Sequence, residues 1–264
     1  MKSLYHRIKS LLALFGFNPT VCINFLRGFP RYLKDLYKFK KLREQMSDDF
    51  QDFRYHIVLG DWYIPNGSAS GQYFHQDMLV ASKIFRSNPV KHVDIGSRVD
   101  GFVAHIAVFR EIEVFDVRPQ KKKVNNIVFK QADLMHLPDG MKNYCDSLSS
   151  LHTIEHFGLG RYGDPLDPNG HLKGLDTIYE ILKPGGMFYF SVPIGKQRIE
   201  FNGHRIFDVA YLLKVLTPKY KVINFAFVDD AGDLHDNVML ESPDLLKNYG
   251  CWNGCGIFEL QKIK

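Results

Sequence analysis

The stretch Val93-Asp-Ile-Gly-Ser97 decides the fold that this sequence predicts. It indicates a short buried strand over 92–96, followed by a glycine turn and a helical pattern over 101–110. Further helical patterns cover 172–182 and 207–216, and strand patterns cover 113–116, 127–132, 144–151, 187–192, 222–228 and 256–262. This alternation predicts an α/β, Rossmann-like, doubly wound and mostly parallel seven-stranded sheet with helices on both faces.

Length and composition set the broad class. The chain has 264 residues, of which 45% are hydrophobic and 24% charged, as in ordinary globular proteins. Intrinsic disorder, collagen-like repeats and a disulfide scaffold are therefore excluded as explanations. The four cysteines form no C-x-x-C pair, and we expect no metal site. We predict a basic helical N-terminal extension over 1–70 and one α/β domain over 71–264.

Charge separates the N-terminal extension from the rest of the chain. Residues 1–45 hold ten Lys and Arg against two acids, whereas the other 219 residues are slightly acidic. Apolar residues recur at helical spacing at Leu4, Ile8, Leu11, Leu12 and Phe15, and again at Phe29, Leu33, Leu36 and Tyr37. We expect Gly28 and Pro30 to divide this region into separate helices.

A basic amphipathic extension has three interpretations. It can cover the α/β domain, contact an anionic membrane surface or bind nucleic acid. We favour the first interpretation, in which the extension covers the α/β domain and its charges are simply solvated. Nucleic-acid binding is the least favoured, because the rest of the chain is slightly acidic. We expect a cytoplasmic protein, with peripheral contact at the inner face of the membrane through residues 1–45 as the second interpretation.

Polar residues follow three successive strand patterns. Asp94, Gly96 and Ser97 end the first, Asp116 ends the second, and Asp133 follows the third. In open α/β sheets, ligands bind beyond the carboxyl ends of the strands. Glycine lets the backbone approach a ligand, and an acid after the second strand is placed to accept ribose hydroxyls. Each acid alone is a weak signal, but three in register predict one ligand crevice.

These residues and later ones resemble a known family. Val93-Asp-Ile-Gly-Ser97, Asp116, Ala132-Asp-Leu134, Ser150-Leu-His-Thr-Ile-Glu-His156 and Leu182-Lys-Pro-Gly-Gly186 together look like a class I S-adenosylmethionine (SAM)-dependent methyltransferase. The resemblance covers about 75–230, and Gly158–Pro168 with Phe201–Arg205 looks like a branch associated with surface-polysaccharide biosynthesis. It implies SAM as cofactor and methyl transfer to oxygen of a sugar or glycan intermediate that can be lipid-linked.

The resemblance also implies site residues. It assigns Gly96 to the methionine part of SAM, Asp116 to the ribose and Asp133 to the adenine. Asp94, Ser97, Leu134 and His152 are the remaining predicted cofactor contacts. The family loop is usually G-x-G-x-G, but Arg98 replaces the middle glycine here. A non-catalytic nucleotide- or partner-binding protein on the same fold is therefore the alternative.

Histidines supply the predicted general base. Methyl transfer to a hydroxyl requires removal of a proton, and histidine suits this role near neutral pH. We predict His156, His204 and His75 as candidates, and Arg205 or Arg161 as holders of an acidic acceptor group. His152-Thr-Ile-Glu-His156 also matches the zinc-protease pattern H-x-x-E-H. Its position directly after a strand disfavours the zinc interpretation.

Overall fold

A computed structural model describes residues 16, 19–44, 52–63 and 66–263. The chain divides into two compact units, residues 1–68 and 69–264, and each is described by itself. The predicted apolar pattern from Leu4 to Phe15 lies outside the described residues. Among the described residues, no helix is both long enough and apolar enough to cross a membrane.

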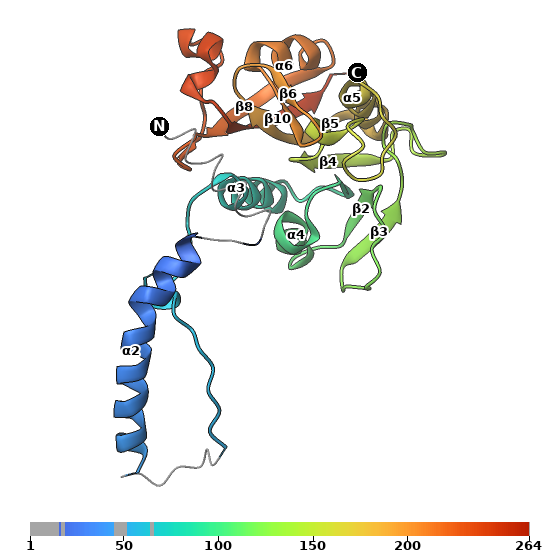
Figure 1. The fold of residues 1–264 in the computed structure, drawn as a ribbon. Coiled ribbons are helices and arrows are strands. Elements are labelled where there is room, and N and C mark those ends of the chain that lie inside the picture. The colour runs from blue at the N-terminus through green and yellow to red at the C-terminus, as the bar shows by residue number, and fades with distance from the viewer. Residues whose placement is uncertain (1–15, 17–18, 45–51, 64–65, 264) are drawn as a thin grey trace. The chain divides into compact units, whose positions relative to one another are not determined.

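The first unit is built on one long helix, α2 (Pro19–Arg43). An extended segment returns beside it and ends in a short helix, Asp61–Tyr63 (Figure 1). The prediction that Gly28 and Pro30 divide the helix was wrong, because α2 continues through both. Gly28 packs directly on Leu59, whose carbonyl oxygen would lie 2.6 Å from a Cβ at position 28. This packing favours a continuous helix where local propensity alone predicts a break.

The second unit is an α/β domain with one eight-stranded sheet. The strands are ordered β3-β2-β1-β4-β5-β10-β8-β9. Their bounds are β1 (His92–Ile95), β2 (Ile112–Asp116), β3 (Ile127–Gln131), β4 (Cys145–Leu151), β5 (Leu182–Ile194), β8 (Tyr220–Val228), β9 (Leu234–His235) and β10 (Gly254–Lys262). The seven predicted strands all belong to this sheet. The count of seven was one short, because the two-residue β9 pairs with β8.

The sheet is parallel from β3 to β5 and antiparallel at β10. β10 lies between β5 and β8 and pairs with both in antiparallel register. A separate hairpin joins β6 (Arg198–Glu200) to β7 (His204–Ile206). The carboxyl ends of β1, β2, β3 and β4 therefore meet along one edge, where a ligand cleft is expected.

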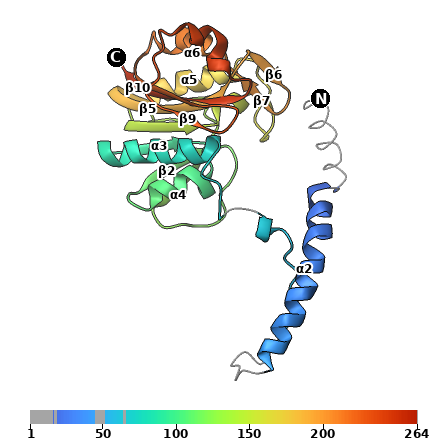
Figure 2. The ribbon, with the colours of Figure 1, turned by 90° about the vertical axis from the view of Figure 1, so that its left-hand side faces the viewer.

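Helices cover both faces of this sheet (Figure 2). One face carries α3 (Gln72–Ser87) and α4 (Ala104–Ala107), which follows a wide turn over Val99–Val103. The other carries α5 (Gly170–Ile181) and α6 (Val209–Leu216). Apolar side chains fill both layers, with Ile84 and Ile106 in one core and Leu175 and Leu212 in the other. Short helices at Ile154–His156 and Pro243–Gly250 complete the unit.

Candidate functional site

A cavity of about 360 Å³ opens at the carboxyl edge of the parallel strands. Loops after β1, β2, β3 and β4 line it, together with the first turn of α3 and the segment around His204. Eight of the predicted cofactor and catalytic candidates lie in its wall: Gly96, Ser97, Asp116, Asp133, Leu134, His152, His156 and His204. Asp94 and His75 do not line it.

Gly96 allows the backbone to turn sharply at the end of β1. Its φ angle is +71°, and a Cβ at this position would lie 2.3 Å from Cγ2 of Thr153. The Gly96 N–H donates to the carbonyl oxygen of Phe115, at 2.8 Å. Any side chain here would combine backbone strain with a steric clash. The cavity wall at this point is therefore bare backbone.

Asp94 lies buried beneath this loop. Its carboxylate accepts hydrogen bonds from the Ser97 N–H at 2.9 Å, from Ser97 Oγ at 2.7 Å and from Ser149 Oγ at 2.5 Å. Burial raises the pKa of Asp94 to about 6, although these hydrogen bonds oppose the shift. The structure thus places Asp94 as a support of the glycine loop, outside the cavity wall, and not in the predicted position of a cofactor contact.

Asp116 ends β2 and has a cationic partner that the sequence analysis missed. Arg118 Nε lies 3.0 Å from Oδ1 of Asp116, and Arg118 Nη2 lies 2.6 Å from Oδ2. The guanidinium also lies 4.3 Å from the ring centre of Tyr162. Asp133, which follows β3, accepts the Met135 N–H at 2.9 Å. Both acids face the cavity with carboxylate oxygens that have further acceptor positions.

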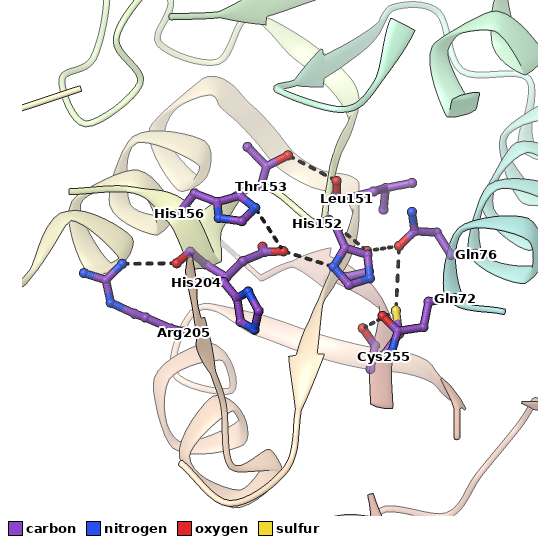
Figure 3. A network of polar contacts seen from close by, with 12 residues as sticks. Gln72, Gln76, Leu151, His152, Thr153, His156, His204, Arg205 and Cys255 are labelled. Atoms are coloured by element: carbon purple, nitrogen blue, oxygen red, sulfur yellow. Dashed lines mark hydrogen bonds and ion pairs between the residues drawn. The ribbon is translucent and has the colours of Figure 1, made fainter. Parts of the chain in front are cut away.

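A buried carboxylate pairs with the first histidine of the H-x-x-E-H segment and lies near the second (Figure 3). Glu155 Oε1 lies 3.0 Å from Nδ1 of His152 and 3.7 Å from Nε2 of His156. Burial opposes charge on His152, but contacts with Cys255 and Glu155 outweigh it and hold the pKa of His152 well above its usual value. Glu155 Oε2 is buried and has no hydrogen-bond partner among the described residues. The motif therefore forms a charged pair inside the cavity wall.

His156 differs from His152 in protonation and in orientation. Its Nδ1 lies 2.8 Å from the carbonyl oxygen of Gly203, so Nδ1 carries the proton and donates. Burial lowers the pKa of His156, which leaves the ring neutral at pH 7 with Nε2 as a proton acceptor. The His204 ring lies 6.4 Å away, in an edge-on orientation. Both rings belong to the wall of the cavity.

Two other predicted residues have different surroundings from those expected. His75 lies on α3 beside the ring of Phe74, at 5.3 Å, and is not part of the cavity wall. Arg205 is buried and donates to the carbonyl oxygens of Phe157 at 2.6 Å and Pro168 at 3.2 Å. It therefore fastens the 157–168 loop and is not available to hold an acceptor. Arg161 does line the cavity, and it donates to Gly203 O at 2.9 Å.

Several cavity residues were not found from the sequence. Gln76 accepts a 2.5 Å hydrogen bond from Ser191 Oγ, and Asp77 accepts one from Gln76 Nε2 at 3.0 Å. The sequence predicted no role for Glu155 beyond its place in the H-x-x-E-H pattern. In the described part of the chain, no three or more His, Cys, Asp or Glu residues are grouped to hold a metal ion. The sequence did contain a signal for Gln76 and Asp77, because the start of α3 is polar. This end of the helix lines the same cavity.

Comparison with known proteins places the chain in a family. The model of the family described as "Caenorhabditis protein of unknown function, DUF268" matches residues 108–242, just over half of the chain. The chain belongs to this family. No curated protein matches the chain by sequence.

Solved structures identify the fold. The N-methyltransferase NodS from Bradyrhizobium japonicum WM9, in complex with S-adenosylhomocysteine (SAH), has a TM-score of 0.50 at 12% identity, covering 74% of this chain and 89% of NodS. A proposed sarcosine dimethylglycine methyltransferase from Galdieria sulphuraria has a TM-score of 0.51 at 12% identity, covering 72% and 86%. This DUF268 member therefore has the class I SAM-dependent methyltransferase fold.

Proposed function

We propose that this chain is a SAM-dependent methyltransferase that binds SAM in the cavity at the carboxyl edge of the sheet. One observation carries the proposal: Gly96, Asp116 and Asp133 lie at or just after the ends of three strands and line one cavity on a methyltransferase fold. The fold alone does not establish an activity, because one fold can support many functions. The support comes from the chemistry of these side chains.

The cavity residues fit SAM. The volume of about 360 Å³ lies within the range of about 300–1,000 Å³ of small-molecule sites. Gly96 presents bare backbone to the cavity, because Thr153 leaves no room for a Cβ, and Glu155 Oε2 is a buried acceptor without a partner among the described residues. Arg118 uses three of the about four lone-pair sites on Asp116, and the remaining site, on Oδ2, is left for a ligand hydroxyl.

Each of these residues has a proposed role. Asp116 would accept the ribose hydroxyls, Asp133 would accept from the adenine amine, and the Gly96 backbone would adjoin the methionine part. SAM, when bound, supplies a methyl group already activated by the sulfonium. The task of the protein is then to align an acceptor and to remove its proton.

We propose that the acceptor is a hydroxyl on a sugar or glycan intermediate, as in surface-polysaccharide biosynthesis. His156 is the proposed base, because its Nδ1 is held by Gly203 O and its neutral Nε2 accepts protons. Tyr73 and Tyr162 add aromatic rings to the same wall, beside Arg98 and Arg161. Rings and hydrogen-bond donors of this kind suit the apolar faces and hydroxyls of a sugar.

Calorimetric titration with SAM and with SAH tests the proposal. The wild-type chain should bind both with dissociation constants on the order of micromolar. Asp116→Ala should weaken binding at least about tenfold, because it removes hydrogen bonds to a charged acceptor worth roughly 1.5–3 kcal/mol. Asp139→Ala is the matched control, since Asp139 is exposed and lies outside the cavity wall. Folded protein without heat from either ligand would overturn the proposal in favour of a non-catalytic binding protein.

A further inference from the structure

The exposed surface of α2 has an apolar stripe. Leu26, Phe29, Leu33 and Tyr37 follow helical spacing, so they lie along one side of the helix. Leu26 is 73% exposed, Leu33 is 49% exposed and Tyr37 is 62% exposed. Scattered exposed apolar residues need no explanation, but a continuous stripe of large side chains marks an interaction site.

A cationic stripe lies next to the apolar one. Arg27, Lys34, Lys38 and Lys41 also follow helical spacing, each one position or a helical turn from an apolar residue. The whole helix carries seven Lys and Arg against the single acid Asp35. In the described part of the chain, Arg27, Lys34 and Lys38 have no acidic partner. These charges are therefore available to an anionic surface.

The return segment packs on α2 at Gly28 and Arg31 and also contacts Lys40, seven residues after Leu33. Gly28 is buried against Leu59, and Lys40 Nζ lies 2.8 Å from the hydroxyl oxygen of Tyr55. Arg31 lies 3.1 Å from the ring centre of Trp62, and this ring is itself exposed. The unit thus has its own internal packing, and that packing leaves the cationic stripe and Leu26, Leu33 and Tyr37 of the apolar stripe exposed. It also adds an exposed Trp, a residue enriched at membrane interfaces.

We infer that α2 binds peripherally to an anionic lipid surface. An apolar stripe beside a row of Lys and Arg matches a helix that lies in the headgroup region, with its apolar side toward the acyl chains. Anionic headgroups attract the cations, and the acyl boundary accepts Leu26, Leu33 and Tyr37. The inference does not depend on the proposed methyl transfer.

The charge of α2 argues against two other binding partners, a second copy of this chain and nucleic acid. In a seam between two copies, the cationic stripes of both helices would approach each other with only Asp35 to compensate. Nucleic acid would neutralise the cations but would leave the apolar stripe in water. An anionic lipid surface neutralises the cationic stripe and also removes the apolar stripe from water.

Vesicle co-sedimentation of the full chain tests this inference. We expect binding to vesicles of phosphatidylcholine with phosphatidylglycerol, weak binding to phosphatidylcholine alone, and release by salt. The double substitutions Leu26→Gln with Leu33→Gln, and Lys34→Gln with Lys38→Gln, should each reduce partitioning at least about tenfold. Circular dichroism checks that the helix remains.

Matched substitutions elsewhere serve as the control. Val90→Gln with Val108→Gln removes two exposed apolar residues from the α/β domain and should leave vesicle binding unchanged. Equal binding of the α2 variants and the wild type would overturn the inference, as would absence of vesicle binding. A dimer that Leu26→Gln with Leu33→Gln dissociates, or binding to RNA without binding to vesicles, would also overturn it. SAH affinity is measured on the same samples. It tests the proposed function separately, because vesicle binding by α2 does not depend on SAM binding.

Discussion

Nδ1 of His152 lies 3.0 Å from Oε1 of Glu155, and both side chains are almost completely buried. His152 directly follows β4 and has a φ of +50°, a conformation that costs a non-glycine residue free energy. Its backbone N–H donates to the carbonyl oxygen of Ser191 at 3.0 Å. Strain and buried charge therefore meet at one point in the cavity wall, as is common at functional sites.

Glu155→Gln should destabilise the fold. The substitution leaves His152 buried without its carboxylate partner, a change that costs about 3–5 kcal/mol in buried pairs. Because contacts with Cys255 and Glu155 raise the pKa of His152 on folding, the stability contributed by its charged form is complete below about pH 6.5 and declines as the pH rises through the folded-state value. Denaturant unfolding measures the loss. Glu200→Gln, at an exposed pair with Arg198, should cost no more than about 1 kcal/mol; equal effects would contradict the prediction.

The titration of Asp94 should appear in the pH dependence of stability. Its pKa is about 6 in the folded chain, against about 3.9 for an unfolded carboxyl, so ionisation disfavours folding. Its contribution to the free energy of unfolding should fall by about 3 kcal/mol as the pH rises from about 4 to above 6. His92, whose pKa burial lowers to about 3, has the opposite sign, because its contribution is lost as the pH falls below about 6.5.

Asp94→Asn separates these two effects. His92 is present in both proteins, so the difference in unfolding free energy between wild type and variant isolates Asp94. That difference, wild type minus variant, should decrease as the pH rises from about 4 to about 7. Denaturant unfolding across this range measures it, and a difference that stays constant with pH would show that Asp94 does not titrate there.

Gly96→Ala should reduce stability and SAH affinity together. The substitution adds backbone strain of about 1–2 kcal/mol and a clash with Thr153 of about 1–3 kcal/mol. Gly140→Ala is a close control, because Gly140 has φ +72° and no atom within 4 Å of an added Cβ. It should show the strain alone and bind SAH normally. Equal behaviour of the two variants would contradict the requirement for a residue without a Cβ at position 96.

His156→Ala should impair catalysis and spare cofactor binding. With a hydroxyl compound that the wild type methylates, kcat should fall by about 10²- to 10⁴-fold, which is the usual contribution of a general base. Because the base must be neutral and burial lowers the pKa of His156, the wild-type rate should decline only when the pH falls below about 6.5. SAH titration should match the wild type.

His75→Ala is the matched control for this prediction. His75 lies outside the cavity wall, so its removal should leave both kcat and SAH binding near wild-type values. A His156→Ala variant with a normal rate and pH profile would assign the base to another group. His204 would be the next to test, since it faces the same cavity.

Patterns along the sequence predicted the sheet well and the details of the site less well. β1 is buried along its whole length, and such short apolar runs bounded by turns are visible without a structure. The bond between Arg118 and Asp116 depends on a turn that orients both side chains, and no spacing rule specifies it. Arg205 illustrates the same limit, because carbonyl groups distant in the sequence determine its role.

The helical extension shows where local rules fail. Gly28 and Pro30 are strong local signals for a helix break, yet α2 continues through them. The deciding contact is with Leu59, about thirty residues further along the chain, which no local window includes.

The structure of the chain crystallised with SAH tests the central claim most directly. We predict SAH in the cavity at the carboxyl edge of the sheet, in contact with Gly96, Asp116 and Asp133. An empty cavity at saturating SAH, or SAH bound elsewhere on the molecule, would contradict the account.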